Sequence, residues 1–429
     1  MIIHVVRAGE SLWSISRAYG ISIQRIIEAN GIRELPHLIP GQALIIPSVE
    51  RTYTVQAGDT LWSISRRFNV PVDRLMEVNH ISNPNLINPG TVIRIPEKAK
   101  NFGSIEVNAF IEHVSREVDI QTVNEVGRYL TYISPFSYQV NSDGSLNPLL
   151  DEGILETARR HRVAPMMVIT NFRGGNFDTE LVHGILTNDS VQQNLIRSVL
   201  DVLRRKNYYA LNIDFERIPP EDRERYNSFL RKVVNALRSQ NYPVSTSLAP
   251  KPFDIRTGPW HGAHDYRAHG QIVDFVILMT YEWGWSGGPP MAVAPINEVK
   301  RVIDYAVTVI PPRKIMMGMP LYGYDWVLPY MPGGEWAQRV GPQEALMIAA
   351  RFGVNIQYDE KAQSPFFNYT DRQGARHVVW FEDARSVRAK FELVNQRRLK
   401  GVSYWVLGVS FTQNWEVLDN LFRITKIAT

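Results

Sequence analysis

Hydrophobic and polar positions along residues 101–429 predict strands and helices in turn. Short apolar runs recur here, and between most of them apolar residues return at helical spacing, as in 191–206 and 222–240. Strands that alternate with helices predict a parallel sheet covered by helices. Eight such units predict an α/β fold, a (β/α)₈ TIM barrel over residues 104–429. The expected strands are 106–111, 129–134, 166–170, 210–215, 244–248, 275–280, 315–320 and 402–406.

The stretch between Tyr322 and Trp380 breaks this alternation. It is too long for the single helix of a regular strand–helix unit. We therefore expect a small α+β insertion at about residues 323–379. The chain length of 429 residues also exceeds what one ordinary core supports, which predicts more than one domain.

The first hundred residues contain a duplication without gaps, at a spacing of 49 residues. Each copy reads as strand, helix, helix, strand. In the second copy these elements are 52–55, a helix capped by Asp59 or Thr60, 71–78 and 91–95. We expect two small βααβ domains, at 2–48 (the first repeat) and 51–97 (the second repeat). A polar linker at 97–104 joins them to the barrel.

Composition narrows the classes of protein to which this chain can belong. It has no cysteine, so disulfide bonds and thiolate metal sites are excluded. No apolar run is long enough to span a membrane, and the first residues lack the basic and apolar segments of a secretory signal. The net charge is only +4 and there is no basic run, so we expect no nucleic-acid partner and no membrane insertion.

Both repeats carry the same signature. Each opens with Ala-Gly, an acidic residue, a hydroxyl residue and Leu-Trp-Ser-Ile-Ser, and each closes through Pro-Gly and an apolar strand to a proline. This signature resembles the LysM domain. The resemblance implies that each repeat binds the N-acetylglucosamine of peptidoglycan or chitin in a groove between two loops. The implied binding residues are Gly9, Glu10, Ser11 and Leu12, facing 35–40, and Gly58, Asp59, Thr60 and Leu61, facing 84–89. The two signature tryptophans, Trp13 and Trp62, are expected to be core residues.

A ladder of polar residues marks the fourth expected strand. Side chains two residues apart share a face of a strand, so Asn212, Asp214 and Glu216 lie on one face and apolar residues on the other. The two carboxylates are then about 6.6 Å apart along the strand. An edge strand with a solvated acidic face is the usual explanation of such a pair. Here Tyr281 and Trp405 end the sixth and eighth strands, so the barrel brings them to the same rim as Glu216.

The same segments resemble glycoside hydrolase family 18, over residues 104–429. Residues 209–216 read Y-A-L-N-I-D-F-E against the family pattern D-x-x-D-x-D-x-E, residues 279–282 read M-T-Y-E, and residues 403–405 read S-Y-W. The resemblance implies that Glu216 is the general acid, Asp214 orients the substrate acetamide, Tyr281 donates to its carbonyl and Trp405 forms the floor of the site. The same motif implies substrate contacts from Met279 and Glu282. Four further aromatic residues lie on expected rim loops and are candidates either for stacking on other sugars or for packing, namely Trp283, Trp285, Tyr322 and Trp326.

The chain departs from the family pattern at several positions. Tyr209 and Asn212 stand where the pattern has aspartates, and Glu282 replaces the more usual aspartate. We expect the Asn212 amide to donate to Asp214 and to change the pH profile without inactivating the site. No histidine pair has metal-ligand spacing, so no metal and no cofactor are expected.

Together, the two repeats and the barrel resemble the spore cortex-lytic N-acetylglucosaminidases of endospore-forming bacteria. This implies a retaining, substrate-assisted enzyme acting on cell-wall peptidoglycan and located in the coat or cortex region of the spore, without a signal peptide. The alternatives are a chitinase or another endo-β-N-acetylglucosaminidase, an extracellular or cell-wall location, and an inactive lectin-like barrel. We expect the barrel to have its own core, so that removing residues 1–100 leaves hydrolysis of soluble fragments largely intact.

Overall fold

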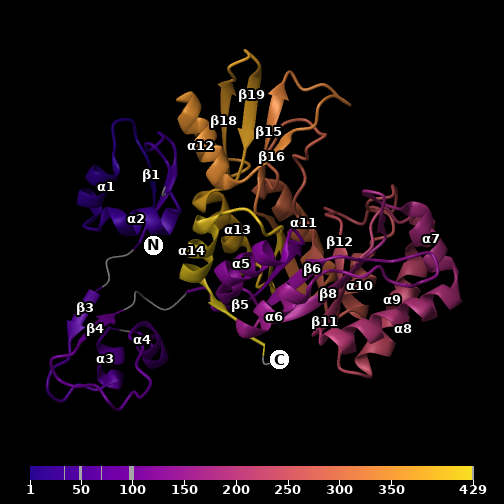
Figure 1. Ribbon diagram of the computed structural model, residues 1–429, viewed down its shortest axis with the longest axis horizontal. Helices are drawn as coiled ribbons and strands as arrows, with labels where there is room; N and C mark the ends of the chain where they lie inside the picture. Colours follow the sequence, from indigo (N-terminus) through magenta and orange to yellow (C-terminus); the bar gives the residue numbers. More distant parts are fainter. Residues whose placement is uncertain (33, 48–50, 69, 96–100, 428–429) are drawn as a thin grey trace.

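The computed structural model describes residues 1–32, 34–47, 51–68, 70–95 and 101–427 (Figure 1). Each repeat is a βααβ unit whose two strands pair antiparallel. The elements of the first repeat are β1 (Ile2–Val5), α1 (Leu12–Tyr19), α2 (Ile23–Asn30) and β2 (Ala43–Ile46). Those of the second repeat are β3 (Arg51–Thr54), α3 (Leu61–Phe68), α4 (Val72–Val78) and β4 (Val92–Ile95). The expected βααβ organisation is confirmed.

The large domain is a closed barrel of eight parallel strands, which confirms the predicted TIM barrel. Pairing of the last strand with the first, and of the third with the fourth, completes the ring. In ring order the strands are β5 (Ser104–Glu112), β6 (Tyr132–Phe136), β8 (Ala164–Thr170), β11 (Ala210–Asp214), β12 (Val244–Leu248), β13 (Phe275–Leu278), β14 (Ile315–Pro320) and β20 (Gly401–Trp405). The second strand begins three residues later than expected, because Gly127–Tyr129 form a 3₁₀ turn, η1.

Helices surround the barrel, and the strands alternate between an inner and an outer core. In β11, Leu211 and Ile213 pack outward against the helices, whereas Ala210 fills the barrel with residues such as Met166 and Phe275. The surrounding helices are α5 (Arg116–Val126), α6 (Glu152–Arg160), α7 (Thr179–Thr187), α8 (Asp189–Lys206), α9 (Arg223–Arg238), α10 (Tyr266–Ile272), α11 (Ile296–Val309), α13 (Ala384–Gln396) and α14 (Thr412–Leu421). Shorter elements are β7 (Tyr138–Gln139), β9 (Phe172–Arg173), β10 (Asn176–Phe177), β21 (Arg423–Ile424), η2 (Pro220–Asp222) and η3 (Pro312–Lys314).

The insertion before the last barrel strand is an α+β unit, as expected. Its five antiparallel strands follow the order β16-β15-β19-β18-β17, and one helix packs against them. In Figure 1 this unit stands above the barrel. Its elements are β15 (Gly323–Leu328), β16 (Gln338–Val340), α12 (Pro342–Phe352), β17 (Gln357–Asp359), β18 (Ser364–Thr370) and β19 (Arg376–Trp380).

The first repeat is docked on the barrel and on this insertion, beside α12 and α14 (Figure 1). All four residues of β2 are buried. Ile39 and Leu44 of the repeat share one apolar cluster with Leu346 and Phe367 of the insertion. The expectation that the barrel has a separate core is therefore wrong where its insertion meets the first repeat.

The second repeat differs from the first at the equivalent strand. Residues of β4 alternate between exposed and buried, as in a strand with one free face. Its apolar cluster, which includes Leu61, Ile64 and Ile93, consists only of residues of this repeat. The two copies of one sequence motif thus have different roles in the architecture.

The prediction that Trp13 and Trp62 are core residues is wrong. Their side chains are 64% and 60% exposed. In α1 and α3 the inward positions belong to Ile15 and Ile64, and the preceding tryptophans point to the other side of the helix. Each ring instead makes a cation–π contact with the arginine one helical turn later. The guanidinium carbon lies 5.6 Å (Arg17) and 4.5 Å (Arg66) from the ring centre.

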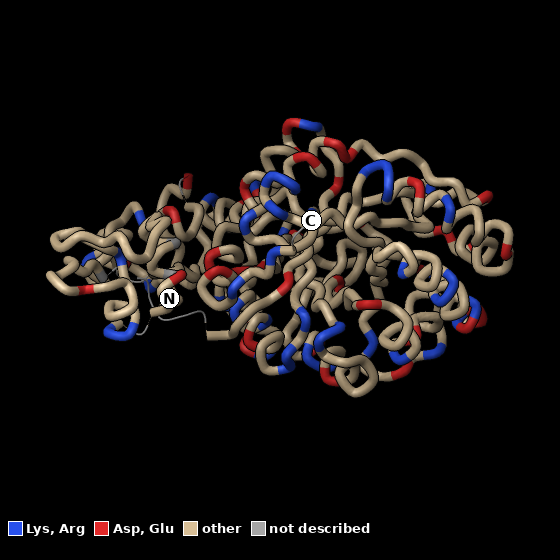
Figure 2. Tube along the Cα trace, turned by 90° about the horizontal axis from the view of Figure 1, so that it is seen from below, with Lys and Arg blue, Asp and Glu red and all other residues tan. Residues whose placement is uncertain are grey.

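Charge is spread evenly over the molecule. Figure 2 shows Lys and Arg interspersed with Asp and Glu along both the repeats and the barrel. Within the described residues, no helix combines the length and the apolar character that crossing a bilayer requires.

Candidate active site

Asn212 and Asp214 point into the barrel from β11, whose alternation follows the sequence pattern. Both side chains are buried. Asn212 Nδ2 donates to Ser245 Oγ at 3.0 Å, and Ser247 Oγ donates to Asn212 Oδ1 at 3.1 Å. The expected donation from Asn212 to Asp214 is wrong, because the Asn212 amide bonds instead to two serines of the neighbouring strand β12. Among the described residues, Asp214 Oδ1 is buried without a hydrogen-bond partner.

The two carboxyl groups have perturbed pKa values. Burial raises the pKa of Asp214 to about 7, although the nearby hydroxyl group of Ser247 opposes the shift. Burial, the Asp214 charge and the Glu282 charge together raise the pKa of Glu216 well above its usual value. This shift favours the protonated form of Glu216, and its partly exposed side chain has a path to a bound ligand. A protonated carboxyl beside a second carboxyl is an arrangement suited to general acid catalysis.

Asn171 and His264 fix the backbone at Glu216. Asn171 Oδ1 accepts from Glu216 N at 3.0 Å, and Asn171 Nδ2 donates to Glu216 O at 2.9 Å. From the opposite side His264 Nε2 donates to Phe215 O at 3.1 Å, since His264 Nδ1 accepts from Ala249 N. Neither residue was predicted from the sequence. The available signal was the position of Asn171, directly after the third strand at the catalytic end of the barrel.

Tyr281 and Glu282 follow β13 at the same rim. Burial and the nearby carboxylates raise the pKa of Tyr281, so its hydroxyl keeps the proton that it can donate. Glu282 has a φ of 65° and its Oε1 accepts from both Tyr322 Oη and Tyr324 Oη. Burial raises the pKa of Glu282, and the two hydroxyl donors oppose that shift.

The aromatic residues at the rim divide into exposed and buried groups. Trp405 is partly exposed and contacts Phe136 edge to face, with 4.8 Å between ring centres. Met279 and Trp283 are also partly exposed, and Trp285 is 43% exposed. Tyr322 and Trp326, however, are only 1% and 2% exposed. The prediction that these two present faces to sugars is wrong, because the insertion covers them and Tyr322 instead supports Glu282.

In the repeats, the predicted binding loops are shaped by their own polar side chains. Glu10 Oε2 accepts from Arg7 N at 2.7 Å, and Asp59 Oδ2 accepts from Gln56 N at 2.8 Å. Ser11 and Thr60 cap the following helices. Gly9 and Gly58 have φ values of 84° and 88°, which favour glycine. Leu61 is buried and Leu12 partly so, whereas Gly9, Ser11, Gly58 and Thr60 are exposed.

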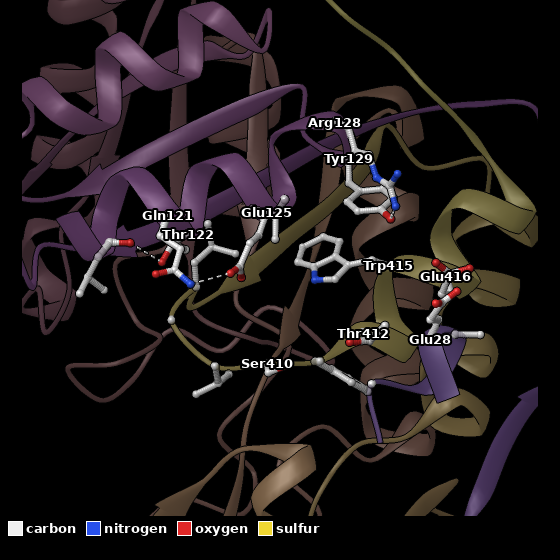
Figure 3. Close-up of a pocket in the computed structure, with 18 of the residues that line it drawn as sticks. Glu28, Gln121, Thr122, Glu125, Arg128, Tyr129, Ser410, Thr412, Trp415 and Glu416 are labelled. Carbon is white, nitrogen blue, oxygen red and sulfur yellow. Dashed lines mark hydrogen bonds between the residues drawn. The ribbon is translucent and has the colours of Figure 1, made fainter. Parts of the chain in front are cut away.

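Over the described residues, no group of three or more His, Asp or Glu side chains has the geometry to hold a metal ion. A cavity of about 870 Å³ lies between α2 of the first repeat and the barrel. Figure 3 shows Tyr129 and Trp415 in its wall, with their rings stacked 5.4 Å apart between centres. None of the predicted site residues lines this cavity.

Known proteins match this chain over both the repeats and the barrel. The sequence profile described as Glycosyl hydrolases family 18 matches residues 153–409, and the LysM domain profile matches residues 4–47 and 53–96. The chain is 48% identical to the cortical fragment-lytic enzyme of Bacillus subtilis (strain 168) over 429 residues, 99% of each chain.

Two crystal structures resemble the chain over nearly its whole length. The spore cortex-lytic enzyme SleL of Bacillus cereus has a TM-score of 0.84, and that of Bacillus megaterium QM B1551 has a TM-score of 0.85. Each is 41% identical, and the similarity covers 99% of both chains. The resemblances predicted from the sequence motifs are thereby confirmed. The chain belongs to glycosyl hydrolase family 18 and carries two LysM domains before its catalytic barrel.

Proposed function

We propose that this glycosyl hydrolase is a retaining, substrate-assisted β-N-acetylglucosaminidase that cleaves bacterial peptidoglycan, in particular fragments of the spore cortex. The observation that carries the proposal is the pair of carboxyl groups Asp214 and Glu216, in which burial and the Asp214 charge raise the pKa of Glu216 and so favour its protonated form. The names of the full-length relatives, cortical fragment-lytic enzyme and spore cortex-lytic enzyme, support the choice of substrate.

In the first step, Glu216 donates its proton to the glycosidic oxygen as the bond from C1 to that oxygen breaks. The carbonyl oxygen of the substrate's own 2-acetamido group attacks C1, so an oxazolinium ion forms without a protein nucleophile. The leaving sugar departs as a neutral alcohol. Asp214, buried with an unpartnered oxygen, accepts from the acetamide N–H and stabilises the positive charge.

In the second step, ionised Glu216 takes a proton from water as the water oxygen attacks C1 and opens the oxazolinium ring. Two displacements at C1 leave the β-configuration unchanged. Tyr281 donates to the acetamide carbonyl, and Trp405 forms the apolar floor under the reacting sugar. Further contacts with this sugar or its neighbours come from Met279, Glu282 and Trp283. Asn212 supports the site through its hydrogen bonds to two serines of β12.

The exposed loops of the LysM repeats are proposed to hold N-acetylglucosamine units of the same polymer, which raises the local substrate concentration. Because the first repeat is docked on the barrel, its groove keeps one position relative to the active site. We also propose that the enzyme acts in the coat or cortex region of the spore, as the names of its relatives suggest.

Identification of the new reducing end tests this function. The enzyme is incubated with cortex fragments and with chitin oligomers, and the products are identified by mass spectrometry and their anomers by NMR. An oxazolinium requires a 2-acetamido group with a free carbonyl oxygen, which muramic lactam lacks. We expect reducing N-acetylglucosamine with the β-anomer formed first. Reducing muramic ends or a first α-anomer would contradict the mechanism, turnover of chitin alone would favour the chitinase alternative, and binding without turnover would favour a lectin.

A further inference from the structure

Arg217, the residue directly after the proposed acid, has an unusual environment. It lies on a sharp turn with a φ of 55°, and its Nε is buried without a hydrogen-bond partner among the described residues. Its guanidinium group lies over the ring of Trp260, with Cζ 5.5 Å from the ring centre. A guanidinium group has five N–H donors, so Arg217 keeps unused capacity to bind an acceptor beside Glu216.

Two carboxylates in the segment around Trp260, those of Asp254 and Asp265, are already paired with other cations. Asp254 accepts from Arg223 at 2.9 Å and from Arg256 at 2.8 Å, and Asp265 accepts from Arg223 at 3.0 Å. The described ion pairs therefore leave the charge of Arg217 without a protein carboxylate. A guanidinium group without a protein carboxylate can form charged hydrogen bonds with a carboxylate of a ligand.

The partner of Arg217, Trp260, lies on a loop that is held firmly in place. Lys251 Nζ, fully buried, donates to Ile255 O at 2.9 Å and to His264 O at 2.7 Å. Trp260 itself is 46% exposed. The pair thus presents an apolar ring and an adjoining cation on a fixed support, which is the combination that suits a sugar ring with an acidic substituent.

This inference rests on the proposed function. If N-acetylglucosamine must occupy the reacting position, then in an alternating glycan both sugars beside it are muramic acid units. A muramic acid unit that is not in the lactam form carries a carboxyl-bearing ether substituent, either free or extended by amino acids that end in a carboxylate. A cation beside Glu216 can pair with such a substituent, whereas a muramic lactam and both neighbours in chitin are neutral. We propose that Arg217, with Trp260 as its apolar support, selects glycans that carry a carboxylate on the sugar beside the reacting N-acetylglucosamine.

The test compares one glycan in two charge states. Peptidoglycan fragments are used with their carboxylates free, or after the carboxylates have been converted to amides and the reagent removed. We expect the wild type to show a kcat/KM at least about tenfold higher on the acidic form, in the range of a charged hydrogen bond. Arg217→Gln should abolish this preference and leave turnover of the amidated form within about twofold. Arg217→Lys should keep part of the preference. Arg256→Gln, on the same loop but already paired with Asp254, is the matched control and should keep all of it.

Other results would overturn the inference or the function on which it rests. If Arg217→Gln loses activity equally on both forms, Arg217 only shapes the turn, and the inference is wrong. A wild type without preference, or a variant that keeps it, also overturns the inference. If the wild type releases no reducing N-acetylglucosamine from either form, the proposed function itself fails, and with it the basis of the inference.

Discussion

The side chain of Gln413 on α14 donates to Asn30 Oδ1 and to Ala43 O of the first repeat, each at 2.8 Å. Asn30 also accepts from Ile45 N, which anchors β2 to α2. The equivalent residue of the second repeat, Asn79, makes the same bond to Arg94 N. The two repeats thus share this internal hydrogen bond. In the first repeat alone, Gln413 of the barrel donates a further hydrogen bond to the same asparagine oxygen.

This docking predicts different sensitivity at equivalent positions of the two repeats. Ala43 is buried under Gln413, whereas its counterpart Val92 is 61% exposed. Ala43→Arg places an unpaired charge in the interface and should lower the melting temperature by roughly 5 °C or more. Val92→Arg is the matched control and should change it by less than about 1 °C. Melting is followed by calorimetry, and equal small effects would show that the first repeat is undocked in solution.

Glu216→Gln should lower kcat at least about a hundredfold while glycan binding remains, because the amide is nearly isosteric but cannot donate the proton. The measurements are turnover of soluble cortex fragments and their binding by calorimetry. Glu221→Gln, in the nearby η2 turn, is a control for the loss of one carboxylate at this side of the barrel. A Glu216→Gln enzyme with more than about one hundredth of wild-type kcat would contradict the assignment of the acid.

Asp214→Asn should abolish turnover yet stabilise the fold at alkaline pH. The folded pKa of Asp214, about 7, lies above its ordinary value of 3.8, so the folded state prefers the neutral carboxyl. The contribution of this group to stability is greatest below pH 3.8 and is lost as the pH rises through about 7. The neutral amide avoids that loss. The free energy of unfolding of the variant should exceed that of the wild type by roughly 2–4 kcal/mol at pH 8, and by much less at pH 4. Urea denaturation at the two pH values measures this difference, and a constant difference would contradict burial as the cause of the shift.

Asn171 should act as a positioning residue for Glu216. In Asn171→Asp a carboxylate oxygen replaces the donor to Glu216 O, and a new negative charge lies beside the acid. We expect kcat to fall about tenfold or more with little change in KM. The alkaline limb of the pH profile should move to higher pH, because the added charge raises the pKa of Glu216, which must be protonated to act as the acid. Asn176→Asp adds the same charge at an exposed position of the adjacent β-hairpin and should change neither. A loss confined to stability, with an unchanged pH profile, would show that Asn171 is only structural.

Local patterns in the sequence determined the fold class, the duplication and the position of the polar ladder. The period of the apolar runs predicted the barrel, and the spacing of 49 residues predicted the two repeats. The two-residue period of residues 210–216 placed Asn212 and Asp214 on the inner face of β11 and Glu216 just beyond the end of that strand. These features were readable because each depends on neighbours within a single strand or helix.

The tertiary structure alone decided which partners those residues have. Asn212 bonds to serines of the next strand, and Asn171 reaches Glu216 across 45 positions of sequence. Burial of Tyr322 depends on how the insertion folds over the rim, and the choice of Ile15 over Trp13 for the core depends on which face of α1 is covered. The two repeats share one motif, but within the described residues only the first is docked on the barrel. The residues opposite its strand β2 come from α12, α13 and α14, more than 290 positions away. Such contacts depend on the packing of distant elements, and no local pattern in the chain encodes them.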